Sequence, residues 1–225
     1  MIEGLHRADI ERLTVRVLRP PLDARPDVRL IDRDGARLVV KDYASGGTRF
    51  KSALGVYLVS REDRALARAN GLPGIPRYYG LIDAYALVLE YIEAESAPEV
   101  PAEWLDEDFF AALERLVTSF HARGVVHCDL KKLDNILVTC DRKPYVIDFT
   151  AAFVSGSNPL SGLLFDHMRD DDFRGVYKLK RRCAPHLLTP AEERFLDFRS
   201  APERGFRAFR EHVREAVQRW SAGKG

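Results

Sequence analysis

A group of polar residues between His127 and Asp148 has types and spacing suited to phosphate chemistry. Asp129 lies six residues before Asn135, which opens the apolar run Ile-Leu-Val, and Asp148 follows thirteen residues after Asn135. A carboxylate in a loop can orient an attacking hydroxyl and accept its proton, and an asparagine and a second aspartate can hold magnesium. Phosphoryl transfer needs little more from a protein than such positioned carboxylates and cations. The group is therefore a candidate site for phosphoryl transfer.

The order of these residues is more informative than any one of them, because a single aspartate in a loop is usually a cap or a solvated charge. The ordered set His127, Asp129, Lys131, Asn135 and Asp148 resembles the catalytic loop and metal-binding segment of the protein-kinase fold. The resemblance implies that Asp129 is the catalytic base or orienting residue and that Lys131 lies near the transferred phosphate. It also implies that Asn135 and Asp148 bind magnesium, and that His127 is structural.

One spacing in this stretch departs from the pattern that it resembles. The family places four residues between the aspartate and the asparagine, whereas five lie between Asp129 and Asn135. Either the loop bulges and Asn135 still binds the metal, or Asp134, which has the standard offset, replaces it. We favour Asn135 because Asn-Ile-Leu-Val leads directly into the expected strand. Lys132 is the corresponding alternative to Lys131.

A second charged group lies in the N-terminal part of the chain. Lys41 ends the β-rich run Leu-Val-Val, and a lysine at the end of a buried strand is costly unless its charge is paired. Glu62 is the expected partner, because it lies four residues after Leu58 and four before Leu66 on the buried stripe of the next helix. The neighbouring Asp63 is the rival. By resemblance, Lys41 paired with Glu62 holds the α- and β-phosphates of a nucleotide.

The apolar strand that ends at Ile92 resembles the hinge of the same fold. By that resemblance, Leu89 takes the gatekeeper position, and the carbonyl of Glu90 and the amide of Ile92 face adenine. Backbone groups make these contacts, so the side chains carry little information about them.

Three features that usually complete such a site are missing. No Gly-x-Gly-x-x-Gly sequence precedes Lys41, so either residues 16–25 or residues 46–49 must cover the phosphates, or nucleotide binding is weak. Thr150 stands where a flexible glycine usually follows Asp-Phe. The next segment, residues 151–159, is short and lacks an Ala-Pro-Glu sequence. We therefore expect neither control by loop phosphorylation nor docking of extended peptides.

A small sheet and one helix must position the N-terminal group. The Asp34-Gly35 pair between two β-rich runs is a hairpin signal. The helix expected over residues 52–70 has apolar residues at helical spacing and ends at Gly71. The sequence predicts strands over residues 13–18, 28–32, 37–43, 78–82 and 86–92.

The C-terminal part is expected to be mainly helical around one hairpin, residues 135–139 and 145–149, which brings Asn135 and Asp148 together. Expected helices start after the N-cap Asp106, at residues 170–172, at the capping box 189–192, and at Glu203. The predicted fold class is α+β, a truncated two-lobed protein-kinase-like fold. Its antiparallel N-terminal, nucleotide-binding lobe covers residues 1–92, and its catalytic lobe covers residues 93–225.

Composition excludes several classes of protein. The 225 residues carry 35 basic and 34 acidic side chains, so bulk charge gives no reason to expect nucleic acid as a partner. No apolar run approaches the roughly 20 residues that span a bilayer, and residues 1–11 lack the apolar core of a secretory signal. The three cysteines match neither a disulfide framework nor a zinc site, which favours the cytoplasm. The arginine-rich stretch 203–220 could contact the inner face of a membrane, with a solvated helix face as the alternative.

Over residues 28–150 the chain resembles small bacterial members of the kinase fold, notably lipopolysaccharide-core sugar kinases and, more distantly, RIO kinases. The resemblance implies an ATP- and magnesium-dependent kinase that phosphorylates a hydroxyl of a sugar, a glycolipid or another small molecule. One alternative is a Ser/Thr protein kinase, which could also phosphorylate itself, and another is a pseudokinase that only binds a partner. A pseudokinase has no need for the complete set Lys41, Glu62, Asp129, Asn135 and Asp148.

Overall fold

The computed structural model describes residues 4–22, 25–44, 49–156 and 159–197. The chain divides into two compact units, Met1–Leu187 and Leu188–Gly225. The predicted lobe boundary between residues 92 and 93 falls within the first unit and stays a prediction. The predicted helix over residues 203–220 lies outside the described residues.

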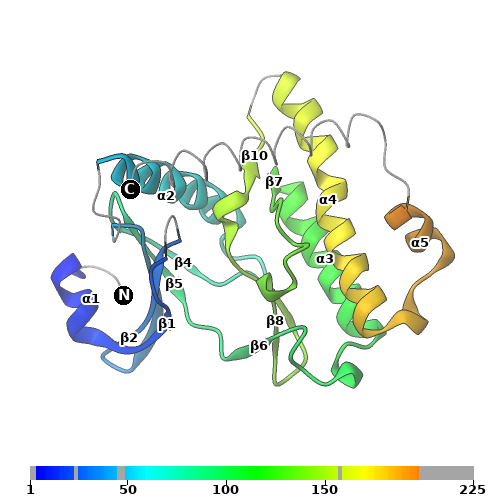
Figure 1. Ribbon diagram of the computed structural model, residues 1–225, viewed down its shortest axis with the longest axis horizontal. Helices are drawn as coiled ribbons and strands as arrows, with labels where there is room; N and C mark the ends of the chain where they lie inside the picture. The colour runs from blue at the N-terminus through cyan, green and yellow to red at the C-terminus, as the bar shows by residue number, and fades with distance from the viewer. Residues whose placement is uncertain (1–3, 23–24, 45–48, 157–158, 198–225) are drawn as a thin grey trace. The chain divides into compact units, whose positions relative to one another are not determined.

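A five-stranded antiparallel sheet forms the N-terminal part of the first unit (Figure 1). In the order β1-β2-β3-β5-β4, its strands are Thr14–Arg19 (β1), Asp27–Arg33 (β2), Ala36–Asp42 (β3), Ala86–Glu90 (β5) and Tyr78–Asp83 (β4). Helix α1 (Arg7–Leu13) precedes the sheet, and α2 (Arg49–Ala69) joins β3 to β4. The predicted strands and helix are present, but β5 stops before the predicted end at Ile92, because the chain leaves the sheet after Glu90 to reach β6 (Ala94–Ser96).

The β2–β3 hairpin sets which side chains face which side of the sheet. Asp34 and Gly35 have φ angles of 55° and 82°, the left-handed conformation that a two-residue hairpin turn requires. On β3, the Leu38 side chain packs in a small apolar cluster that includes Ile10 of α1, whereas Val39 packs against the larger core of the unit. Successive side chains on a strand point to opposite faces, so Lys41 shares the face of Val39. The strand pattern therefore directs Lys41 toward the larger core.

Helix α2 packs one face against the rest of the unit. From residue 59 onward its buried positions follow helical spacing, as expected for a helix on a core: Val59, Glu62, Ala65, Leu66 and Ala69. After the helix, the side chain of Asn70 bonds both the backbone N–H and the carbonyl of Tyr78, each at 3.0 Å. These bonds fix the end of α2 to β4.

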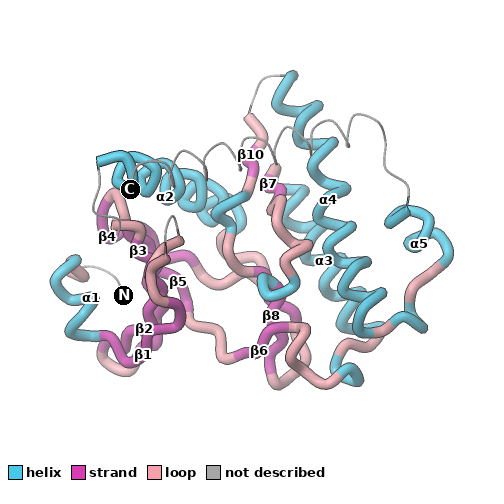
Figure 2. The backbone as a smooth tube through the Cα atoms, in the orientation of Figure 1, coloured by secondary structure: helices cyan, strands magenta, loops and turns pink. Residues whose placement is uncertain are grey.

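The remainder of the first unit is mainly helical. Helices α3 (Glu107–Ala122) and α4 (Pro159–Cys183) lie side by side (Figure 2). The short elements are η1 (Ala102–Trp104), β7 (Val125–Val126), η2 (Leu133–Asn135), β8 (Ile136–Thr139), β9 (Pro144–Val146), η3 (Phe149–Ala151), β10 (Phe153–Val154) and η4 (Pro185–Leu187). The predicted hairpin is β8–β9, and β6 pairs with its outer side.

Helix α3 begins at its predicted cap and contributes most of the aromatic core. The Asp106 side chain accepts the N–H of Phe109 at 2.9 Å. Phe120 of α3 meets Phe149 of η3 edge to face, with ring centroids 6.0 Å apart. Both rings are fully buried. This contact anchors the residue that follows Asp148 in the core.

Helix α4 begins earlier than the sequence predicts. It starts at Pro159, so the acidic residues 170–172 lie within the helix and do not open it. Asp172 is fully buried there. Its carboxylate accepts the backbone N–H groups of His127 and Cys128, which compensate for the loss of water. The acidic cluster that suggested a helix start thus reflects, in part, a tertiary contact.

In the second unit, α5 (Pro190–Asp197) starts with the predicted capping box. The N–H of Thr189 donates to Glu192 at 2.7 Å, and the N–H of Glu192 donates to the Thr189 hydroxyl at 3.3 Å. Across the described ranges of both units, no helix is long and apolar enough to cross a membrane.

Candidate active site

Asp172 of α4 fixes the backbone of the loop that carries Asp129. Its Oδ2 accepts the N–H of His127 at 2.7 Å, and its Oδ1 accepts the N–H of Cys128 at 2.8 Å. Oδ2 also lies 3.0 Å from Nε2 of His121 on α3. Cys128 has a φ of 66°, a conformation that a non-glycine residue keeps only where its surroundings hold it. The sequence alone does not reveal this role of Asp172, whose backbone partners lie 45 and 44 residues away.

His127 joins this loop to the segment that carries Asp148. Its Nε2 lies 2.9 Å from the carbonyl oxygen of Ile147, and its Nδ1 accepts the N–H of Asp129 at 3.3 Å. The tautomer protonated at Nε2 satisfies both contacts. The ring also packs against Phe149, with centroids 4.7 Å apart. Through these contacts, His127 positions the segments that carry Asp129 and Asp148.

The extra residue of the loop is absorbed by η2. The N–H of Lys132 donates to the carbonyl of Asp129 at 3.1 Å, and the N–H of Asn135 donates to that of Lys132 at 3.0 Å. The buried Asn135 side chain then donates from Nδ2 to the Asp129 carbonyl at 3.1 Å. Asp134 is exposed. The geometry therefore brings Asn135, rather than Asp134, against the loop backbone.

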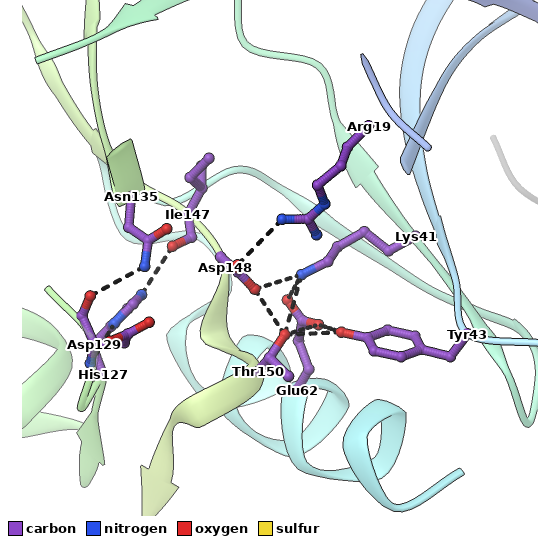
Figure 3. Close-up of polar contacts among 10 residues, drawn as sticks. All are labelled: Arg19, Lys41, Tyr43, Glu62, His127, Asp129, Asn135, Ile147, Asp148 and Thr150. Carbon is purple, nitrogen blue, oxygen red and sulfur yellow. Dashed lines mark hydrogen bonds and ion pairs between the residues drawn. The ribbon is translucent and has the colours of Figure 1, made fainter. Parts of the chain in front are cut away.

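Lys41 lies between two carboxylates (Figure 3). Its Nζ donates to Oε1 of Glu62 at 2.5 Å and to Oδ1 of Asp148 at 2.9 Å. Lys41 is 4% exposed and Glu62 is 0% exposed. Burial by itself lowers the pKa of Lys41, but the charges of Asp148 and Glu62 outweigh it and raise that pKa above its usual value. Asp63, the rival partner, accepts the hydroxyl of Tyr78 at 2.6 Å instead.

Asp148 is held in its charged form by these same contacts. Burial would raise its pKa, but the charge of Lys41 and hydrogen bonds from Lys41 and Thr150 lower the pKa of Asp148 well below its ordinary range. Its second oxygen, Oδ2, lies 3.9 Å from Nη1 of Arg19 at the end of β1. Two cations from the sheet thus approach one carboxylate.

Two hydroxyl groups complete the network. Oγ1 of Thr150 lies 2.7 Å from Oδ1 of Asp148, 3.0 Å from Oε2 of Glu62 and 2.8 Å from the hydroxyl of Tyr43. The Tyr43 hydroxyl also donates to Glu62 at 2.9 Å, and burial raises the pKa of Tyr43, which keeps it a donor. Tyr43 follows Lys41 by two residues and shares its face, a signal that could have identified it. Thr150 is visible in the sequence only as the loss of a glycine.

Three further predicted site residues are Lys131, Glu90 and Ile92. Lys131 is exposed, and Glu90 and Ile92 are partly exposed. At the end of β5, the N–H of Glu90 donates to the carbonyl of Arg77 at 2.9 Å, and the Glu90 carboxylate accepts the N–H of Arg77 at 3.0 Å. Leu89 is buried beside them.

The segment between η3 and α4 is fastened to α2. Arg61 donates to the carbonyls of Ala151 and Ala152 at 2.8 and 3.1 Å. Two helical turns further along α2, Arg68 donates to the carbonyl of Ser155 at 3.1 Å. Helix α2 is therefore bonded to the chain on both sides of β10.

A cavity of about 490 Å³ lies next to β5, and the residues of the Lys41 network do not line it. Its lining consists of residues 70–75, Arg77, Glu90 and Tyr145. Glu90 is its one link to the predicted site residues. In the described part of the chain, no group of three or more His, Cys, Asp or Glu residues is arranged to hold a metal ion.

Comparison with known proteins gives a family match, a related sequence and similar solved structures. The model of the RIO domain family matches residues 32–170. A protein of Streptomyces coelicolor described as "Probable SapB synthase" is 35% identical over 142 residues, covering 53% of this chain and 15% of that protein. A solved structure, the Rio2 kinase-ADP/Mg²⁺-phosphoaspartate complex from Chaetomium thermophilum, aligns with a TM-score of 0.57 at 18% identity, covering 85% of this chain and 63% of that chain.

The structural match confirms the predicted α+β, protein-kinase-like fold. The chain spans about a seventh of the Streptomyces coelicolor protein and somewhat less than two thirds of the solved chain. It is thus shorter than the chain whose fold it shares.

Proposed function

Because this chain belongs to the RIO domain family, we propose that it is an ATP- and magnesium-dependent phosphotransferase that moves the γ-phosphate of ATP to a hydroxyl group. One observation carries the proposal: the Nζ of Lys41 is held between Glu62 and Asp148, at 2.5 and 2.9 Å. A buried lysine fixed in this way presents a permanent positive charge beside an ionised carboxylate. Phosphoryl transfer depends on such positioned charges.

Lys41 has the role of binding the α- and β-phosphates in this proposal, and Glu62 fixes its position. The ammonium group has three donors, which are directed at Glu62, Asp148 and, at 3.4 Å, the Thr150 hydroxyl. When the Asp148 carboxylate rotates to bind a cation, one N–H group of Lys41 becomes available to a phosphate oxygen. Adenine would bind at the end of β5, to the carbonyl of Glu90 and the amide of Ile92.

The chemistry of Asn135 and Asp148 fits a magnesium ion. Both offer oxygen ligands, which hard cations prefer, and magnesium commonly takes one or two carboxylates and completes its shell with phosphates and water. The Nδ2 of Asn135 is committed to the loop carbonyl, so Oδ1 is the atom that would face the ion. When bound, magnesium would neutralise charge on the phosphates.

Asp129 orients the acceptor hydroxyl and accepts its proton. Its backbone is fixed on both sides, by the N–H contact to His127 and by the carbonyl contacts to Lys132 and Asn135. These contacts hold the backbone of Asp129, whose side chain is partly exposed. Lys131, exposed on the same loop, would approach the phosphate in transfer.

For the acceptor, we favour a sugar or a lipopolysaccharide-type glycolipid. The short segment between η3 and α4, tied to α2 by Arg61 and Arg68, provides little surface for an extended peptide. A Ser/Thr protein kinase is the alternative. Incubating the protein with labelled ATP and a cell-envelope extract separates them: label in glycolipid supports the first, and label confined to protein supports the second.

The substitution Asp129→Asn tests the proposed activity. Removal of the proton acceptor should lower γ-phosphate transfer by about 100-fold or more, because positioned general bases contribute at least that much. Nucleotide affinity should stay unchanged. Asp141→Asn, a charge-matched change in the exposed β8–β9 turn, should retain full transfer. Equal activity of Asp129→Asn and the wild type would contradict the assignment of Asp129.

A further inference from the structure

The turn between β1 and β2 has few backbone groups that could bind a phosphate. Three of its five described residues are prolines, Pro20, Pro21 and Pro26, which have no N–H. The N–H of Arg25 already donates to the carbonyl of Leu22 at 2.8 Å. A backbone cradle of amides is therefore not available from these described residues. Within these described residues, side chains are the source of positive charge for a phosphate.

Arg19, the last residue of β1, lies on the same face of the sheet as Lys41. The strand register pairs Arg19 with Val28 and Val28 with Lys41. Residues directly opposite one another on neighbouring strands share a face. The three form a row across β1, β2 and β3, about 10 Å from end to end. The sheet thus presents two cations side by side.

The guanidinium of Arg19 is directed at the candidate site but forms no close hydrogen bond with Asp148 there. Its Nη1 lies 3.9 Å from Oδ2 of Asp148, longer than a hydrogen bond, and its Nε is buried with no hydrogen-bond partner among the described residues. Figure 3 shows the Arg19 and Lys41 side chains both directed at Asp148. A guanidinium has five donors in a planar fork that matches phosphate oxygens.

We propose that Arg19 binds the outer phosphates of a nucleoside di- or triphosphate, in place of a backbone cradle. This inference rests on the proposed function, because it assigns a ligand to the same site. Arg19 would leave Asp148 when a phosphate provides a closer, bidentate partner, which frees Oδ2 for a cation. The side chain of Lys41 and that of Arg19 would then hold successive parts of the phosphate chain.

Titrations with adenosine, ADP and ATP in the presence of magnesium test the proposal on the full chain. Arg19→Gln should weaken binding of ATP and ADP by about tenfold or more, the loss expected for a charge-assisted hydrogen bond, and leave adenosine binding unchanged. Arg19→Lys, which keeps the charge without the fork, should fall between the two. Arg12→Gln removes an equally charged side chain on α1, 68% exposed, and should bind ATP as the wild type does.

Adenosine affinity reports whether Arg19→Gln is folded, because an unfolded variant would lose the binding of all three ligands. In that case the nucleotide affinities of Arg19→Lys test the proposal. Wild-type affinity of both Arg19 variants for ATP would overturn the proposal. An equal loss of ATP and adenosine binding by folded Arg19→Lys would also overturn it, as would an identical effect of Arg25→Gln in the neighbouring turn. A wild-type protein that binds ATP no better than adenosine would instead overturn the proposed function.

Discussion

The oxygens of Thr150, Tyr43 and Glu62 lie within hydrogen-bonding distance of one another, and Thr150 reaches Asp148 as well. These four contacts between oxygen atoms have two hydroxyl protons to share. Thr150 can therefore donate to Asp148 or to Glu62, but not to both at once. When the Asp148 carboxylate rotates to bind a cation, the Thr150 hydroxyl can donate its proton to Glu62 instead. Thr150 can thus donate to Asp148 in one arrangement of the network and to Glu62 in the other.

Thr150→Val should destabilise the protein and weaken nucleotide binding. Valine keeps the shape of threonine but leaves the buried oxygens of Glu62 and Tyr43 with fewer partners, at a cost of about 1–3 kcal/mol. Urea unfolding and ATP titration measure the two effects. Thr150→Ser keeps the hydroxyl and should restore ATP affinity, since the network needs the oxygen rather than the methyl group. If the valine variant matched the wild type in both measurements, the network would have no role.

At the scale of elements, α4 supports the loop that carries Asp129. Asp172 accepts two backbone N–H groups of that loop. Three residues further along α4, Gly175 lies so close to the loop that an added Cβ would come within 2.6 Å of the Leu130 backbone. A helix position this close to a neighbouring backbone requires glycine. The loop geometry is therefore set by packing against α4.

Asp172→Asn should lower stability by about 1–3 kcal/mol, because an amide offers one acceptor oxygen where the carboxylate serves two backbone donors. We also expect slower transfer at saturating ATP, since the loop that positions Asp129 loses an anchor. Chemical denaturation and turnover rates provide the measurements. The control is Asp166→Asn, an exposed residue of α4 paired weakly with Arg169 at 3.7 Å, which should change stability little. A wild-type unfolding profile for Asp172→Asn would rule out the anchoring role.

The elements of the N-terminal sheet could be predicted because their signals are local. The Asp34-Gly35 turn fixes one hairpin, and the spacing of Glu62 on α2 identifies the residue that faces Lys41. Arg19 and Asp172 could not be assigned in this way, because their roles depend on pairings that join distant segments. The predicted start of α4 was wrong for the same reason: the acidic residues there include one buried against another segment.

At the scale of the whole molecule, the candidate site draws on segments that lie far apart in the chain. Lys41 and Glu62 come from the part that we assign to a nucleotide-binding lobe, residues 1–92. Asp129, Asn135 and Asp148 come from the mainly helical part assigned to catalysis. Bonds such as those from Lys41 to Asp148, 107 residues apart, hold both parts at one site. Nucleotide binding should therefore stabilise the first unit against unfolding.

Titration of ATP with and without magnesium, for the wild type and for Asp148→Asn, tests the central claim most directly. The wild type should bind ATP at least about tenfold more tightly with magnesium, a difference of about 1.4 kcal/mol. Asp148→Asn should lose most of that difference, because it removes the ionised ligand while keeping the side-chain shape. A wild-type affinity that does not respond to magnesium, or an undiminished response in Asp148→Asn, would contradict a magnesium-nucleotide site built on Lys41, Asn135 and Asp148.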